Sequence, residues 1–171
     1  DDVAMGGATW RVITGYGHSS EHASLFAPAR ELLVAGDMLL PRISTNVSVW
    51  PSEPDGDPLG RFLHSLTAFE DLPPGSLVLP SHGLPFRGIP LRIAQLRAHH
   101  AARLAELAEA IAAAPEPVSA AQMVPVLFPR ELDLQQRFFA MGETIAHLNH
   151  LWRQGRLDRS HDAQGNLRFA A

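Results

Sequence analysis

The sequence has 171 residues, a formal net charge of -4 and no cysteine. These values exclude a disulfide framework and a thiolate metal site, and they give no overall attraction to nucleic acid or to an anionic membrane. Hydrophobic residues make up 46% of the chain, which is enough for one large domain or two small ones. No apolar run approaches the roughly 20 residues that span a bilayer, and no signal peptide is visible, so we expect a cytoplasmic protein.

The first 90 residues are rich in glycine and proline, and short apolar runs alternate with turn signals. Four of these runs predict strands, at 10–13, 23–28, 31–36 and 76–80. A helix is predicted over 57–69, with Asp57 as its N-cap and Pro58 in its first turn.

The sequence from residue 91 onward is mainly helical in pattern. Apolar residues at three- and four-residue steps predict a long amphipathic helix over 91–113, in which we interpret His99 and His100 as helix positions and not as ligands. Capping-box patterns begin at Ser119 and Asp133. The second opens a helix to about residue 154, and a hairpin follows it. The apolar stripe of this helix is expected to pack on the long helix: Phe138, Met141, Ile145, Leu148 and Trp152.

Three loops place a metal-binding type of side chain directly after a predicted strand. They are "GYGHS" with His18, "VAGDMLL" with Asp37 and "VLPSHGLP" with His82. Histidine nitrogen and aspartate oxygen are the usual ligands of a catalytic zinc ion, and loops on a rigid sheet are where such sites are built. Each residue alone is common in loops, but the ordered set is far more specific.

The stretches "GHSSEH", "AGDMLL" and "LPSHG" resemble the third, fourth and fifth motifs of the metallo-β-lactamase-fold hydrolases, over roughly residues 9–90. The resemblance implies an α/β fold, an αββα sandwich with one or two metals at one edge, usually zinc, with iron or manganese possible. It implies that His18 ligates the first metal and that His82 ligates the second. Asp37 would bridge both metals and act as the catalytic residue by positioning a metal-bound hydroxide.

One family feature has no counterpart in this sequence, namely the H-x-H-x-D-H stretch of the N-terminal half. We therefore expect residues 1–90 to be the C-terminal part of the sandwich, followed by a connecting helix (91–115) and a winged-helix-like domain (116–171). This tail resembles an extension found on one branch of the superfamily. The chain is then catalytically incomplete, with low metal occupancy. The missing N-terminal half, or a second copy, would cover an inner sheet face expected to include Val12, Leu25, Leu33 and Val78.

The leading functional hypothesis is a metal-dependent hydrolase of a small ester, thioester or lactone. Arg42, Asn46 and Trp50 follow the bridging aspartate and are candidates for substrate binding, and His22 is a candidate for orienting a ligand. One alternative is a nuclease of the same fold. The other is a non-enzymatic winged-helix module that binds nucleic acid or a partner protein. Nucleic acid is disfavoured because residues 150–171 carry only a small excess of arginine over aspartate.

Overall fold

The computed structural model describes residues 1–171. The chain forms two compact units, which we call the sheet unit (Asp1–Thr45 and Gly60–Ala98) and the helical unit (Asn46–Leu59 and His99–Ala171). Helix α2, Ile89–Ala112, contributes its first part to the sheet unit and the rest to the helical unit. None of the helices combines the length and the apolar character that crossing a membrane requires.

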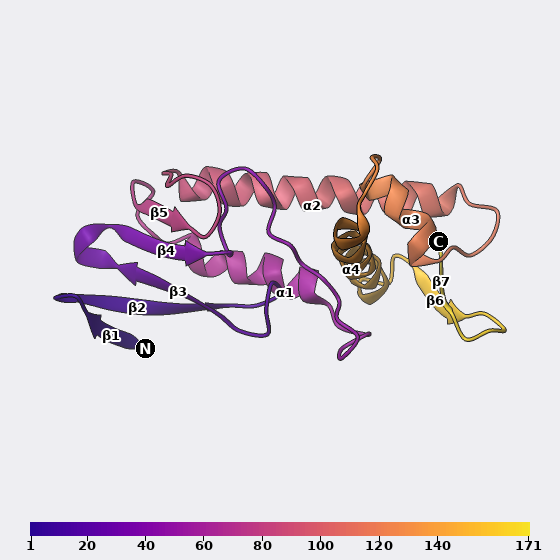
Figure 1. Ribbon diagram of the computed structural model, residues 1–171, viewed down its shortest axis with the longest axis horizontal. Helices are drawn as coiled ribbons and strands as arrows, with labels where there is room; N and C mark the ends of the chain where they lie inside the picture. The colour runs from indigo at the N-terminus through magenta and orange to yellow at the C-terminus, as the bar shows by residue number, and fades with distance from the viewer. The chain divides into compact units, whose positions relative to one another are not determined.

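The sheet unit contains one five-stranded sheet in the order β1-β2-β3-β4-β5 (Figure 1). Neighbouring strands are antiparallel except β4 and β5, which are parallel. The strands are β1 (Asp2–Met5), β2 (Ala8–Gly15), β3 (His22–Ala27), β4 (Leu32–Gly36) and β5 (Leu77–Pro80). The four predicted strands are confirmed. The prediction missed β1, whose four residues are all exposed and whose hairpin turn is made by Gly6 and Gly7 at positive φ.

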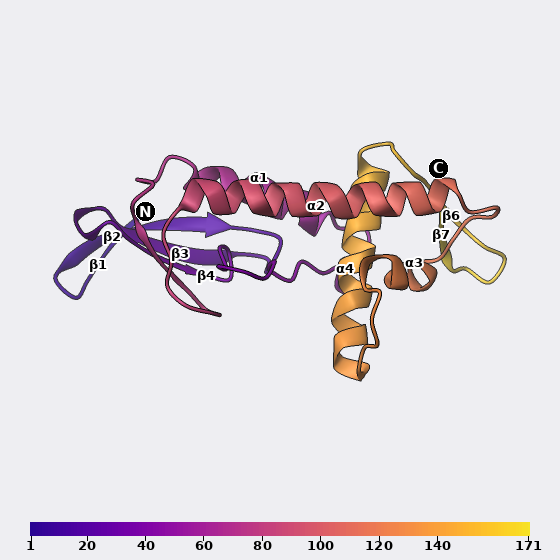
Figure 2. The same ribbon diagram turned by 90° about the horizontal axis from the view of Figure 1, so that it is seen from above.

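One face of the sheet forms the core of this unit. The register aligns Phe26, Leu33 and Val78 in a row across β3, β4 and β5, and all three are buried. Helix α1 (Pro58–Ser65), the 3-10 turn Leu66–Phe69 and the start of α2 cover this face (Figure 2). Their buried side chains follow the predicted helical stripe and include Phe62, Leu66, Phe69, Ile93 and Leu96.

The prediction that Val12, Leu25, Leu33 and Val78 share one inner face is wrong. Leu25 pairs with Val12 on one side and Val34 on the other, so Leu33 points to the opposite face. Side chains alternate along a strand, and a one-residue error in the assumed register exchanges the two faces. The second face therefore carries Val12, Leu25, Val34 and Leu79, which are only half-buried.

The helical unit contains the C-terminal part of α2, two further helices and a hairpin. Their bounds are α3 (Ala120–Leu127), α4 (Leu134–Arg153), β6 (Asp158–His161) and β7 (Leu167–Ala170). Both predicted capping boxes are present, because Ser119 and Asp133 accept hydrogen bonds from the N–H of the residue three positions on. The hairpin turn is closed by Asp162, whose pKa is lowered to about 2 by hydrogen bonds from Asn166, Arg168 and the Gln164 N–H.

The buried face of α4 differs from the predicted stripe. Phe138 is 57% exposed, and Met141 and Ile145 line a surface pocket. Of the predicted stripe only Leu148 is fully buried, and a further set of buried side chains lies one position earlier, at Ala140, Thr144, His147 and Leu151. This stripe contains small and polar residues, so a pattern of large apolar residues did not indicate it.

The second capping box gives a first testable prediction. Replacing Asp133 by alanine should lower the free energy of unfolding by about 1 kcal/mol, because the N–H groups of the first turn of α4 lose their acceptor. Urea denaturation measures this change. Glu109→Ala, at an exposed position inside α2, is the matched control and should change stability by less than about 0.5 kcal/mol. Equal effects of the two substitutions would contradict a capping role.

Candidate metal centre

The candidate metal-binding residues follow the C-terminal ends of three strands. Because β2 and β4 are both antiparallel to β3, and β5 is parallel to β4, these three ends lie at one edge of the sheet. His18 follows β2, Asp37 follows β4 and His82 follows β5. The sheet topology thus brings together residues that are up to 64 positions apart, as the loop contexts predicted.

The geometry places the Asp37 carboxylate between two imidazoles. The Nε2 atom of His18 lies 3.6 Å from Asp37 Oδ2, and the Nε2 atom of His82 lies 3.5 Å from Asp37 Oδ1. Each carboxylate oxygen therefore has a different histidine beside it, which suits a carboxylate that bridges two metal ions. The donor types and their separations fit zinc, for which ligand distances are about 2.0–2.2 Å.

The donor set is nevertheless short of a complete site. A catalytic zinc ion takes three protein ligands, whereas each Asp37 oxygen here has one histidine beside it. No group of three or more histidine, aspartate or glutamate residues is arranged to hold a metal ion on its own. The roles of His18, Asp37 and His82 as ligands remain predictions, although their convergence is confirmed.

Three hydrogen bonds hold Asp37 in this orientation. Ser81 Oγ donates to Asp37 Oδ1 at 2.6 Å, and Thr45 Oγ1 donates to the Asp37 carbonyl. The Asp37 N–H donates to His22 Nε2 at 3.2 Å, so His22 orients the candidate ligand through its backbone. Burial, and secondarily His18, lower the pKa of His22, which favours the neutral ring that can accept this bond. Sequence reasoning missed Ser81, whose only signal was its position directly before His82.

Gly36 is required by the approach of His22. Its φ is +55°, and a Cβ atom there would lie 2.5 Å from both Cε1 and Nε2 of the His22 ring. Any other residue would strain the backbone and push the imidazole away from the Asp37 N–H. The glycine before Asp37 is therefore part of the site and not only a turn residue.

A pocket of about 530 Å³ adjoins His82 in the sheet unit and includes Arg42 in its wall. The loop that carries Arg42 is held by Arg92, a buried residue of α2. Arg92 donates to the carbonyl of Leu40 and, at 2.7 Å, to that of Ile43. Burial lowers the pKa of Arg92. No sequence signal indicated that Arg92, which lies beside the apolar stripe of its helix, would hold this loop.

The other two substrate-binding candidates lie in the helical unit. The side-chain carbonyl of Asn46 accepts a hydrogen bond from Ser48 Oγ at 2.9 Å. Trp50 is 46% exposed, and its ring centroid is 5.9 Å from that of Phe138. The structure thus brings Arg42 beside the candidate metal ligand His82 within the sheet unit. All three assignments stay predictions.

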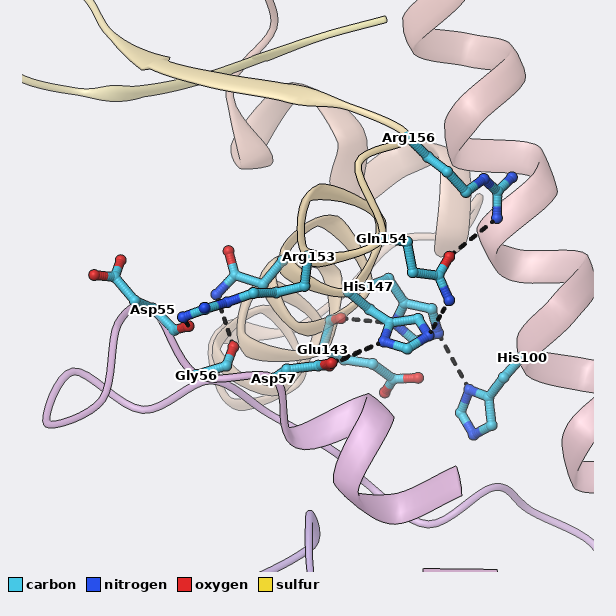
Figure 3. Close-up of polar contacts among 11 residues, drawn as sticks. Asp55, Gly56, Asp57, His100, Glu143, His147, Arg153, Gln154 and Arg156 are labelled. Carbon is cyan, nitrogen blue, oxygen red and sulfur yellow. Dashed lines mark hydrogen bonds and ion pairs between the residues drawn. The ribbon is translucent and has the colours of Figure 1, made fainter. Parts of the chain in front are cut away.

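A second polar cluster lies in the helical unit, where sequence reasoning expected only helix positions (Figure 3). His100 Nδ1 is 3.2 Å from His147 Nε2, and both side chains are fully buried. Burial lowers the pKa of His100 to about 3 and that of His147 to about 4, and neighbouring histidines add to both shifts. Burial raises the pKa of Glu143 to about 7, against the opposing influence of Arg103.

Both parts of the chain are similar to proteins of one known superfamily. Residues 1–82 match the model of the metallo-beta-lactamase superfamily, and residues 104–171 match that of the metallo-beta-lactamase-like C-terminal domain. The chain belongs to the metallo-β-lactamase superfamily, and the predicted fold class is confirmed.

Three relatives illustrate the match. A beta-lactamase domain protein from Burkholderia ambifaria is 56% identical with a TM-score of 0.94, over 99% of this chain and 50% of that one. A metallo-beta-lactamase family protein from Thermus thermophilus is 32% identical with a TM-score of 0.84, over 99% and 52%. A probable metallo-hydrolase from Bacillus subtilis (strain 168) is 28% identical over 146 residues, 83% of this chain and 44% of that protein. The chain thus spans about half the length of these relatives.

The buried histidines give a prediction for pH. Because the folded-state pKa values of His100 and His147 lie below 6.5, the unfolded state binds more protons, and stability should fall as the pH drops from 6.5 toward 4. The slope is at most about 1.4 kcal/mol per pH unit for each histidine. Glu143, with its raised pKa, acts in the opposite direction between pH 4.5 and 7. Urea denaturation midpoints measured from pH 7 to pH 4.5 report the combined effect of the two histidines and Glu143 on stability.

Two variants separate these contributions. Glu143→Gln should steepen the loss of stability on acidification, because it removes the group that opposes the histidines. The double variant His100→Leu and His147→Leu should flatten the loss or reverse it. His64→Ala, at an exposed histidine, is the control and should follow the parent curve. An unchanged slope in the double variant would show that other groups control acid stability.

Proposed function

We propose that this chain supplies half of the metal site of a hydrolase that acts on a small ester, thioester or lactone. The observation that carries the proposal is the Asp37 carboxylate, which has a different histidine beside each of its oxygens at one sheet edge. Superfamily membership and a relative named as a probable metallo-hydrolase support it. A cytoplasmic location stays part of the proposal.

The residues of this chain have distinct roles in that proposal. His18 and His82 would each present Nε2 to a metal ion, zinc in the first instance, and Asp37 would present one oxygen to each. A bound metal of this kind lowers the pKa of a water molecule to about 7 and polarises the attacked oxygen. Ser81 and His22 keep the carboxylate oriented. No serine or cysteine nucleophile is needed.

Substrate binding in the sheet unit would use the pocket beside His82. Arg42 is exposed in its wall and could pair with an anionic group of the substrate. Arg92 fixes the Arg42 loop through the Leu40 and Ile43 carbonyls, so the guanidinium of Arg42 starts from a rigid backbone. In the helical unit, Asn46 and Trp50 remain candidates for further substrate contacts.

The remaining ligands would come from outside this sequence. The missing N-terminal half would supply them, or a second copy of the chain would complete the site. Either would also cover the half-buried sheet face that carries Val12, Leu25, Val34 and Leu79. This part of the proposal is supported by the short donor set and by relatives that are about twice as long.

Neither a nuclease nor a nucleic-acid-binding module is favoured by the helical unit. The exposed side chains near the start of α4 include the apolar Leu134, Phe138 and Phe139. Contact with phosphates requires cationic groups, and the two exposed arginines nearby, Arg130 and Arg137, already donate to Gln136 and to the Leu132 carbonyl. The net charge of -4 also gives no attraction to a polyanion.

The proposal predicts a graded response to substitution in the intact protein. Asp37→Ala should abolish metal retention and ester or thioester hydrolysis, because both metal positions lose a ligand. Ser81→Ala should reduce metal affinity or activity by about 10- to 100-fold, as is typical for residues that orient a ligand. Metal analysis together with hydrolysis of a panel of thioesters and lactones measures both effects.

The control is His64→Ala, which removes an exposed histidine of the same unit and should leave both readouts unchanged. Retention of the full metal content and activity in the Asp37 variant would refute the assignment.

A further inference from the structure

A second pocket lies entirely within the helical unit. Its volume is about 230 Å³, and its wall is almost wholly apolar. Val49, Trp50 and Pro51 form one side, and Phe138, Met141 and Ile145 of α4 form the other. No charged side chain contributes to the wall. A pocket of this composition favours an uncharged, apolar occupant, because nothing in it could compensate a buried charge.

Two aromatic side chains that line this pocket are partly exposed to solvent. Trp50 is 46% exposed and Phe138 is 57% exposed, and their rings meet at 5.9 Å with an angle of 54° between them. Leu134, one turn before Phe138 on α4, is 87% exposed. Single exposed apolar residues are ordinary, but a contiguous group that borders a cavity marks a site of interaction.

The pocket is held open by polar contacts between residues 46–59 and α4. The Val49 N–H donates to the Gly142 carbonyl at 3.0 Å. Asn149 Nδ2 donates to the carbonyl of Pro54 at 2.9 Å and to that of Gly56 at 3.0 Å. A Cβ atom on Gly142 would lie 2.8 Å from the Ser48 Cβ atom, so the close approach depends on glycine.

Side-chain contacts of His150 and Arg159 add to these hydrogen bonds. His150 Nδ1 lies 3.0 Å from both carboxylate oxygens of Asp57, and Gln154 contacts the other ring nitrogen. Arg159 pairs with Asp55 at 2.8 Å, and its guanidinium lies over the Trp152 ring. The wall that carries Trp50 is thus fixed at several points before any ligand arrives, which reduces the entropy lost on binding.

We propose that this pocket binds an uncharged apolar group of a small molecule, the size of one aromatic ring or of a short acyl chain. The size follows from volume, since a dry cavity of about 150 Å³ accommodates benzene and this one measures 230 Å³. Trp50 and Phe138 form the specific contacts by stacking on the group. Binding itself requires no metal. That the apolar group belongs to the hydrolysed substrate rests on the proposed function.

The test uses benzyl alcohol and 1-hexanol as probes, titrated into the isotope-labelled protein. Saturable shifts are expected at the Trp50 indole N–H and the Gly142 amide in spectra that correlate 15N with 1H. Phe138→Ala and Trp50→Ala should weaken binding of both probes at least tenfold. Phe139→Ala is the matched control, because Phe139 is a 39% exposed neighbour on the same helix that does not line the pocket. It should change the affinity less than twofold.

Trp50 and Phe138 are only 46% and 57% exposed, so the thermal unfolding midpoints of both variants are measured alongside to show that they remain folded at the temperature of the titration. Absence of saturable shifts would overturn the proposal, as would equal losses in the Phe138 and Phe139 variants. A concentration-dependent dimer that Leu134→Ala, Phe138→Ala and Phe139→Ala all dissociate would instead identify this surface as an interface between copies. Metal retention by the Asp37 site is scored separately, so failure here is distinguishable from failure of the proposed hydrolase.

Discussion

The candidate site depends on one constraint, the orientation of the Asp37 carboxylate with an imidazole beside each oxygen. A free aspartate side chain rotates readily, and losing that freedom costs conformational entropy. Here the entropy is lost at folding, because Ser81 binds one oxygen while His22 and Thr45 bind the backbone on either side of the side chain. The carboxylate is therefore preorganised before any metal or substrate binds.

The orientation of the Asp37 carboxylate depends on distant parts of the sheet unit. Three strand ends must meet at one edge, which requires β2, β4 and β5 to run in the same direction. The parallel pair β4 and β5 cannot be joined by a short hairpin, and the long connection between them contains α1. Gly36 must lack a side chain so that His22 can reach the Asp37 N–H. The position of the Asp37 carboxylate thus requires the shared direction of β2, β4 and β5, the crossover helix α1 and the glycine at position 36.

The sequence predicted these loops well because each residue follows an apolar run that is recognisable as a strand. It failed where the outcome depends on pairing register or on which of two adjacent stripes is buried. Leu33 and Leu25 look equivalent in the sequence, and only the pairing of Leu25 with Val34 separates their faces. The burial of His100 and His147 depends on their meeting across two helices, and Arg92 acts on carbonyl groups that no side-chain pattern reveals.

The helical unit has an apolar core, but the contact between residues 46–59 and α4 also relies on buried polar groups. Polar groups, including Asn149 and His150, are buried and hold residues 46–59 against α4, while Trp50 and Phe138 remain exposed. Burying polar groups is tolerated only when their hydrogen bonds are made, and here they are directed at backbone carbonyls and a carboxylate. These hydrogen bonds, together with the buried Val47 side chain, hold the segment while Trp50 and Phe138 stay exposed beside the pocket that we propose as an apolar binding site.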